Sequence, residues 1–252
     1  MKVLVTFAVE TEFARWRKRI PFVRRDVAAI AVEHAKIGNA DVDVVITGVG
    51  WDNARRAIEA VMDSSYCLCI SSGFAGGLKP GCAVGDLLAA KSVRTAAKSS
   101  ALQCNAEFVA EAEQSGARSV ETLLSAEAVA STATQKAALA HIADAVDMES
   151  YAIVAAAKRC NVPAVVIRAI SDSFDQDMPM DFSNAISEDG RVLVGVVLRE
   201  VAAHPSILPG LIRLGRQSNR AAERLADFLS EYLQKISSAA GASNVLEAAV
   251  AL

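Results

Sequence analysis

The sequence lacks a strong excess of charge of either sign. Its 26 lysine and arginine residues stand against 29 aspartate and glutamate residues, which gives a formal net charge of −3. A protein that holds nucleic acid through phosphate contacts needs a basic surface, so this balance argues against nucleic-acid binding. No apolar run is long enough to cross a bilayer, and Met1–Phe7 fits a first strand better than a signal peptide. We therefore expect no stable insertion in a membrane.

Cysteine and histidine are scarce, and several catalytic motifs are missing. The five cysteines are odd in number and without metal-ligand spacing, and the three histidines are scattered. These features predict a reduced, cytoplasmic protein without a metal site. The sequence has no Gly-x-Ser-x-Gly elbow, no Walker loop and no His-Glu-x-x-His. A serine hydrolase, a P-loop enzyme and a zinc protease are therefore not predicted.

Apolar residues are plentiful, at 52% of the 252 residues, which is enough for a large core. We find no internal repeat and no domain boundary, so a single domain over residues 1–236 is predicted. Residues 237–252 are mostly small and are predicted to form a flexible tail. One apolar stripe predicts a helix packed on a sheet. Its members are Ala221, Ala222, Leu225, Phe228, Leu229, Tyr232, Leu233 and Ile236.

The most informative stretch runs from Ala145 to Asp172. A short strand leads into Asp-Met-Glu-Ser, a helix follows, and a nearly continuous apolar strand ends in Ser171–Asp172. A strand-helix-strand unit usually joins parallel strands, so these two strands are predicted to be parallel. Glu149 and Asp172 would then both follow the carboxyl ends of strands, where α/β sheets bind ligands.

A third carboxylate, Glu12, follows the first predicted strand, Lys2–Phe7. Any one such acid is more often a helix cap or a partner of the helix dipole. The small residues of Ser71–Leu78 also follow a buried strand and allow a ligand to approach the backbone. This combination predicts one pocket formed by the three acids and the small-residue loop.

Gly48-Val-Gly50 imitates a dinucleotide-binding fingerprint, because it follows a strand and opens a helix. The next strand ends in Ser71–Ser72, with no carboxylate for a ribose diol. Tight packing of strand against helix is therefore favoured over cofactor binding here.

Three motifs together resemble the purine nucleoside phosphorylase and nucleosidase superfamily. They are Val-Asp-Met-Glu-Ser at 146–150, Val-Ile-Arg-Ala-Ile-Ser-Asp at 166–172 and Ser-Gly-Phe-Ala-Gly-Gly-Leu at 72–78. The most similar branch is that of the 5′-methylthioadenosine/S-adenosylhomocysteine nucleosidases, over roughly residues 1–182. The resemblance implies a three-layer α/β/α fold with a central mixed sheet, assembled as a homo-oligomer. It also implies cleavage of the N-glycosidic bond of a purine nucleoside, with adenine as the expected base.

The resemblance also implies a role for each site residue. Asp172 would give a proton to purine N7, and burial is expected to favour its protonated form. Glu149 would hold the ribose 2′- and 3′-hydroxyls, with Met148 against the sugar. Glu12 would position the attacking water of a nucleosidase. The remaining residues implied to line the pocket are Ala75, Gly76, Ser171 and Val49.

Two departures from this branch weaken the expectation of a small thio-nucleoside. The segment Arg94–Asn105 is shorter than the insertion that helps build the 5′ pocket there, and Val129 stands where an aromatic residue stacks on adenine. The segment Asp189–Leu214 instead resembles the hopanoid-associated phosphorylases, which are expected to release adenine from an adenosyl-lipid with phosphate. A basic, apolar helix near Ile207–Arg220 would then contact a membrane peripherally.

Two alternatives stay open at the level of sequence. The attacking group is water or inorganic phosphate, and no other cofactor is expected; Arg168 and Arg56 are candidate phosphate ligands. The rival function is a non-catalytic nucleoside-binding or storage relative of the same fold. Intact Glu149 and Asp172 argue against it, because a pure binder gains little from a proton donor at N7.

Overall fold

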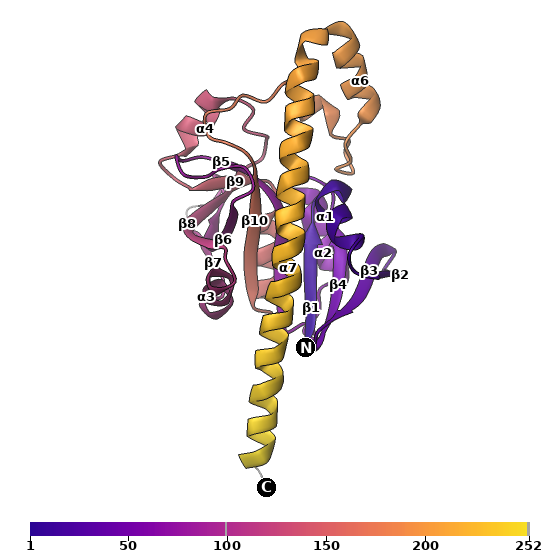
Figure 1. Cartoon of the computed structure of the whole chain (residues 1–252), viewed down its shortest axis with the longest axis vertical. Helices are drawn as coiled ribbons and strands as arrows, with labels where there is room; N and C mark the ends of the chain where they lie inside the picture. The colour runs from indigo at the N-terminus through magenta and orange to yellow at the C-terminus, as the bar shows by residue number, and fades with distance from the viewer. Residues whose placement is uncertain (99, 251–252) are drawn as a thin grey trace.

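The computed structural model describes residues 1–98 and 100–250, with side chains described as far as residue 239. Within them, ten strands form one mixed sheet between two layers of helices (Figure 1). The strands are β1 (Lys2–Phe7), β2 (Val23–Val27), β3 (Ile30–Ile37), β4 (Ala40–Ile46), β5 (Leu68–Gly77), β6 (Leu87–Arg94), β7 (Leu102–Gln103), β8 (Arg118–Ser125), β9 (Ala145–Asp147) and β10 (Ala164–Asp172). This architecture confirms the predicted α/β fold with a central mixed sheet.

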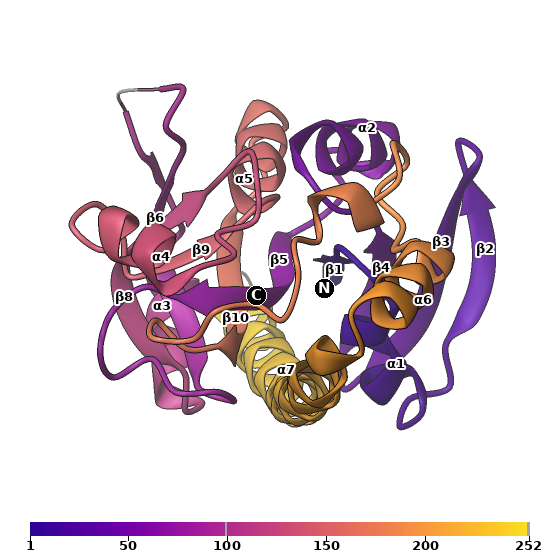
Figure 2. The same ribbon diagram turned by 90° about the horizontal axis from the view of Figure 1, so that it is seen from above.

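The helices cover both faces of the sheet. They are α1 (Glu10–Arg17), α2 (Trp51–Val61), α3 (Ala106–Gln114), α4 (Ala133–Leu139), α5 (Ser150–Arg159), α6 (Val194–Ala203) and α7 (Leu208–Val250), with short 3-10 turns η1 (Ser183–Ala185) and η2 (Pro205–Ile207). Figure 2 shows α2 and α5 on one face and α1 and α7 on the other. The eight residues of the predicted apolar stripe are all buried, which explains why α7 lies along the sheet.

The strands around β5 close on themselves rather than forming an open sheet. The order is β10-β6-β8-β9-β5-β1-β4-β3-β2, and β10 also pairs with β5. The first part of β5 runs parallel to β10, whereas Gly76 and Gly77 at its end pair antiparallel with β9. The long strand β5 is thus shared by two neighbours that run in opposite directions.

The prediction that the strands before and after α5 are parallel is wrong. Strands β9, β8 and β6 run parallel to one another, and β6 pairs antiparallel with β10. Both strands nevertheless end at the same point of β5, because Asp172 pairs with Gly76 and Val146 pairs with that same glycine. The carboxyl ends of β9 and β10 therefore lie together because both strands pair with the end of β5, and not because the two strands are parallel neighbours.

A β-bridge between Ile186 and Val192 precedes helix α6, which begins at Val194. Residues 237–250 continue α7, residues 251–252 lie outside the described residues, and the flexibility of the tail stays a prediction. No helix in the described part of the chain is both long and apolar enough to span a membrane.

Candidate active site

A cavity of about 200 Å³ lies where β1, β5, β9 and β10 end. All eight residues expected at the site line it: Glu12, Val49, Ala75, Gly76, Met148, Glu149, Ser171 and Asp172. Val129, which replaces the expected aromatic residue, lines it as well, together with Phe74 and Met178. The structure therefore brings the three carboxylates together around one space, as the strand-end pattern predicted.

Glu12 is buried and is held by backbone donors from two segments. Its Oε2 accepts hydrogen bonds from the N–H groups of Ala8 (2.7 Å) and Val9 (3.2 Å), so it caps its own helix. Its Oε1 accepts a hydrogen bond from the N–H of Phe74 on β5 (2.7 Å). Burial raises the pKa of Glu12, and the Arg168 guanidinium partly offsets this. A carboxylate has about four acceptor sites, so one remains for a ligand or a water molecule.

Gly73 allows Glu12 and Arg168 to approach the same point of β5. Its φ of +139° lies in the region that favours glycine. A Cβ placed there would stand 2.7 Å from Glu12 Oε1 and 3.0 Å from Arg168 Nη1. Arg168 Nη1 is buried and has no hydrogen-bond partner. The carboxylate and this N–H group therefore both lie against the same side of Gly73.

The other donors of Arg168 are used inside the protein. The guanidinium contacts Asp147 Oδ2 through Nε (2.8 Å) and Nη2 (2.6 Å), and Nη2 also donates to the hydroxyls of Ser150 (2.8 Å) and Ser71 (3.1 Å). Arg168 is therefore mostly engaged by Asp147. The other candidate phosphate ligand, Arg56, is exposed and bonds to its own helix, and neither arginine lines the cavity.

Glu149 lies at the start of α5 with little compensation for its charge. Its Oε1 accepts a hydrogen bond from the N–H of Gly50 (2.7 Å), and its Oε2 lies 3.3 Å from the N–H of Met148. Burial and the nearby Asp147 carboxylate raise the pKa of Glu149, and Arg168 counteracts this only in part. The Gly48–Gly50 segment, which imitates a dinucleotide fingerprint, therefore holds this acid in place.

Asp172 has a partner that sequence reasoning missed. The Ser171 hydroxyl donates to Asp172 Oδ1 (2.7 Å), and Lys136 Nζ lies 2.5 Å from Oδ2, in ion-pair contact rather than in an aligned hydrogen bond. Burial is therefore not the only influence on Asp172, because the Lys136 ammonium group also contacts it. Lys136 lies on α4 among small residues, where nothing in the sequence distinguishes it from a surface lysine.

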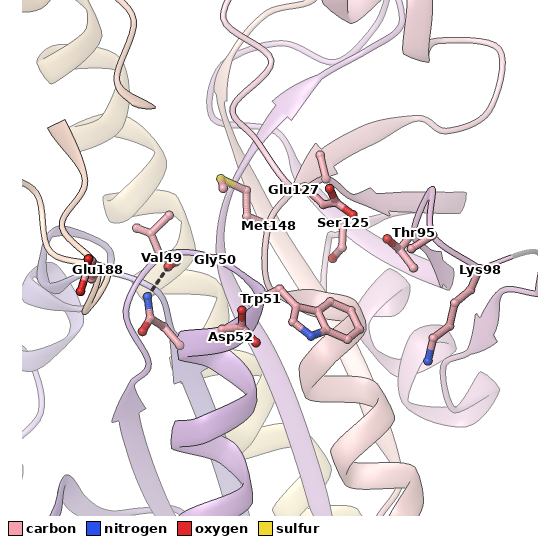
Figure 3. Close-up of a pocket in the computed structure, with 13 residues that line it drawn as sticks. Val49, Gly50, Trp51, Asp52, Thr95, Lys98, Ser125, Glu127, Met148 and Glu188 are labelled. Carbon is pink, nitrogen blue, oxygen red and sulfur yellow. Dashed lines mark hydrogen bonds between the residues drawn. The ribbon is translucent and has the colours of Figure 1, made fainter. Parts of the chain in front are cut away.

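A second, larger cavity of about 590 Å³ adjoins the first, and the two share Val49 and Met148 as walls. Figure 3 shows Met148 between Val49 on one side and Ser125 and Glu127 on the other, with Trp51 below. Thr95, Ala97 and Lys98 also line this cavity, so the short segment after β6 still contributes to the site. Among the described residues, no group of three or more His, Cys, Asp or Glu is placed to hold a metal.

Comparisons with known proteins agree with this geometry. Residues 2–199 match the family model described as the phosphorylase superfamily. A futalosine hydrolase mutant of Helicobacter pylori superposes with a TM-score of 0.73 at 14% identity, covering 93% of this chain and 99% of that one. The 5′-methylthioadenosine/S-adenosylhomocysteine nucleosidase of Streptococcus pneumoniae, with a transition-state inhibitor, gives 0.71 at 20% identity and the same coverage. The corresponding Campylobacter jejuni enzyme gives 0.72 at 15% identity, again over 93% and 99%. At these identities the solved structures establish the fold.

Proposed function

This chain belongs to the phosphorylase superfamily of enzymes, and from that premise we propose that it hydrolyses the N-glycosidic bond of an adenine nucleoside. The observation that carries the proposal is the meeting of Glu12, Glu149 and Asp172 around one cavity. A storage or binding protein has no use for three buried carboxylates there, because each one is costly to bury.

The arrangement matches the charges that develop when this bond breaks. Positive charge grows on the ribose and negative charge grows on the departing purine, so an enzyme must stabilise both ends. Glu149 supplies a carboxylate for the sugar and its hydroxyls, and Asp172 supplies a proton to N7 of the base. One general acid contributes about 10²- to 10⁴-fold to the rate.

Water is favoured over phosphate as the attacking group because Glu12 occupies the anion-binding position. The free N–H groups of a strand-to-helix turn are the natural donors to a phosphate. Here the N–H groups of Ala8, Val9 and Phe74 already bind the Glu12 carboxylate. A phosphate dianion would meet negative charge at this place. A water molecule can instead donate to Glu12, which lines the cavity.

The two adjoining cavities indicate a nucleoside with an extended 5′ substituent. The smaller cavity holds the base and the ribose beside Asp172 and Glu149. The larger cavity begins at Val49 and Met148, on the sugar side, and receives whatever C5′ carries. Two of the similar solved structures are nucleosidases named for such substrates, 5′-methylthioadenosine and S-adenosylhomocysteine.

The test is release of free base from adenosine, 5′-methylthioadenosine and S-adenosylhomocysteine, each with and without phosphate. We expect adenine from at least one of them without phosphate. The 7-deaza analogue of the best substrate should bind without cleavage, since it lacks the N7 atom that takes the proton. Asp172→Asn should lower kcat by about 10²-fold or more and leave the fold intact. No release from any nucleoside would favour the non-catalytic alternative.

A second candidate substrate is an adenine nucleoside with a lipid at C5′, cleaved by phosphate. The observation that favours it is a set of exposed apolar residues on α6, on the start of α7 and just before α6: Val192, Leu193, Val194, Leu198, Leu208 and Ile212. The segment leading to it packs on the cavity wall, since the N–H of Val49 donates to the carbonyl of Gly190 (3.0 Å). Exposed arginines at 191, 199, 213 and 216 accompany it, as in helices that lie on anionic membranes.

The lipid candidate predicts binding to vesicles that contain anionic lipid. A variant with Leu198→Ser and Ile212→Ser should bind them at least about tenfold more weakly, because it loses apolar burial at two positions. The same variant should cleave adenosine at the normal rate. Phosphate-dependent adenine release from adenosylhopane would support this candidate, whereas turnover of 5′-methylthioadenosine without activity on the lipid would overturn it.

A further inference from the structure

Lys136 is a lysine with no exposed surface, fixed by three contacts at the edge of the site. Its Nζ donates to the backbone carbonyls of Ser173 (2.8 Å) and Gln176 (3.0 Å) and contacts Asp172 Oδ2 at 2.5 Å. Lysine is almost never fully buried unless it is paired, because removing an ammonium group from water is costly. The fold therefore holds a cation at one carboxylate oxygen of the presumed acid.

We propose that Lys136 is a positioning residue of the reaction. Its ammonium group orients Asp172 toward the purine and stabilises the carboxylate that remains when Asp172 gives its proton to N7. This inference rests on the proposed function. Asp172 Oδ2, the oxygen that Lys136 contacts, lies 3.0 Å from where a Cβ on Gly76 would stand, and Gly76 lines the cavity. Oδ2 itself has almost no accessible surface, so Lys136 holds the buried oxygen of a side chain that lines the cavity.

The surrounding charges explain why Asp172 needs a cation. The other charged residues that line the cavity are Glu12, Asp147 and Glu149, all of them acids. Arg168 is engaged by Asp147 and does not contact Asp172. Among the residues that the structure describes, Lys136 is the cation in ion-pair contact with Asp172. Without it, a further negative charge would form beside three carboxylates.

The chemical step balances with Lys136 keeping its own protons. As the C1′–N9 bond breaks, its electron pair moves into the purine ring and N7 takes the proton of Asp172. Asp172 becomes a carboxylate in contact with the ammonium group. Water adds its oxygen to C1′ and gives a proton to Glu12. Proton exchange with the solvent then removes this proton from Glu12 and returns one to Asp172. The products are the free base and the sugar.

The experiment compares the wild type with Lys136→Met on two substrates. With adenosine, or the 5′-substituted nucleoside found to be cleaved, kcat should fall by about tenfold or more, within the range of a general acid. With 4-nitrophenyl riboside, whose leaving group needs no proton, the rate should change less than about twofold.

A double-mutant cycle separates this role from a structural one. In an Asp172→Asn background, Lys136→Met should cost no further activity on the nucleoside, because Lys136 acts through Asp172. The control is Lys79→Met, which removes the partly exposed pair with Asp144 (2.8 Å) and should leave kcat unchanged on both substrates.

An equal loss on both substrates or additive losses in the cycle would overturn the role of Lys136. If Lys136→Met folds poorly because it leaves the Asp172 carboxylate unpaired, the double variant still provides a test. It has neither charge, so it buries no unpaired charge at this position. Failure of the wild type to cleave any nucleoside would instead refute the proposed function, so the two failures are distinguishable.

Discussion

The buried Glu149 side chain is proposed to bind the sugar, and its ionisation lowers the free energy of unfolding. Burial and the neighbouring Asp147 raise the pKa of Glu149 above its ordinary value of 4.5. The folded protein then binds a proton that the unfolded chain has already released. The free energy of unfolding therefore falls as pH rises above about 4.5, and the loss is complete above the raised pKa.

Replacing Glu149 by glutamine should therefore stabilise the protein and disable it. Glutamine can still accept the hydrogen bond from the N–H of Gly50 without carrying a charge. We expect Tm to rise by about 1–4 °C at pH 8 and to change little near pH 4. Cleavage should fall by about 10²-fold, because the sugar loses its counter-charge. Calorimetry at the two pH values provides the measurement, and a lower Tm at pH 8 would contradict it.

The positions of the three acids could be predicted from the sequence, but the residues that contact them could not. Glu12, Glu149 and Asp172 each follow a strand, and this position allowed them to be predicted before the structure. Lys136, on helix α4, carries no such signal. The contacts of Lys136 are backbone carbonyls 37 and 40 residues away and a distant carboxylate, which only tertiary structure brings together.

At the scale of elements, the long strand β5 organises the site. One strand supplies Gly73 beside Glu12, Phe74 as a donor to Glu12, and Gly76 beside Asp172. The order of elements was predictable from apolar runs and turn residues. The direction of β9 was not predictable from the sequence. A strand of three residues has too few residues to determine its own pairing, which depends on the strands available around it.

Gly73→Ala should abolish activity with a smaller effect on stability. A methyl group there meets Glu12 Oε1 at 2.7 Å and must displace the carboxylate from the Phe74 N–H. We expect kcat to drop by about 10²-fold or more, since small misplacements of catalytic groups have effects of that size.

The matched control for Gly73→Ala is Gly81→Ala. Gly81 also has a positive φ, of +91°, but a Cβ there meets nothing within 4 Å. That variant should retain its activity while showing some loss of Tm from backbone strain. Equal loss of activity in both variants would mean that backbone strain, and not contact with Glu12, is responsible.

For the whole molecule, α7 ties the two ends of the chain together. The indole N–H of Trp16 on α1 donates to the Ser230 hydroxyl (2.9 Å), and the Tyr232 hydroxyl donates to the carbonyl of Phe108 (2.9 Å). The helix was predictable from its apolar stripe. Its partners were not, because the period of a stripe gives a buried face but not the elements that cover it. Homo-oligomerisation stays a prediction.

Leu229→Ala on α7 should destabilise the fold without changing the chemistry. Leu229 is fully buried, and such truncations cost about 2–5 kcal/mol. We expect Tm to fall by about 5 °C or more, with kcat unchanged at temperatures where the protein stays folded. Leu208→Ala, at a position 46% exposed, is the control and should shift Tm little. A similar fall in Tm for both variants would mean that burial of α7 is not what stabilises it.

The way Glu12 folds back onto the turn that precedes it has a consequence for how this fold diversifies. Its carboxylate accepts hydrogen bonds from three backbone N–H groups that could otherwise bind an inorganic anion. Replacing Glu12 by serine would free these N–H groups and leave Glu149 and Asp172, which are proposed to recognise the sugar and the base, unchanged. Under the proposed function, Glu12→Ser is therefore the substitution that we expect to let phosphate take the place of water as the nucleophile.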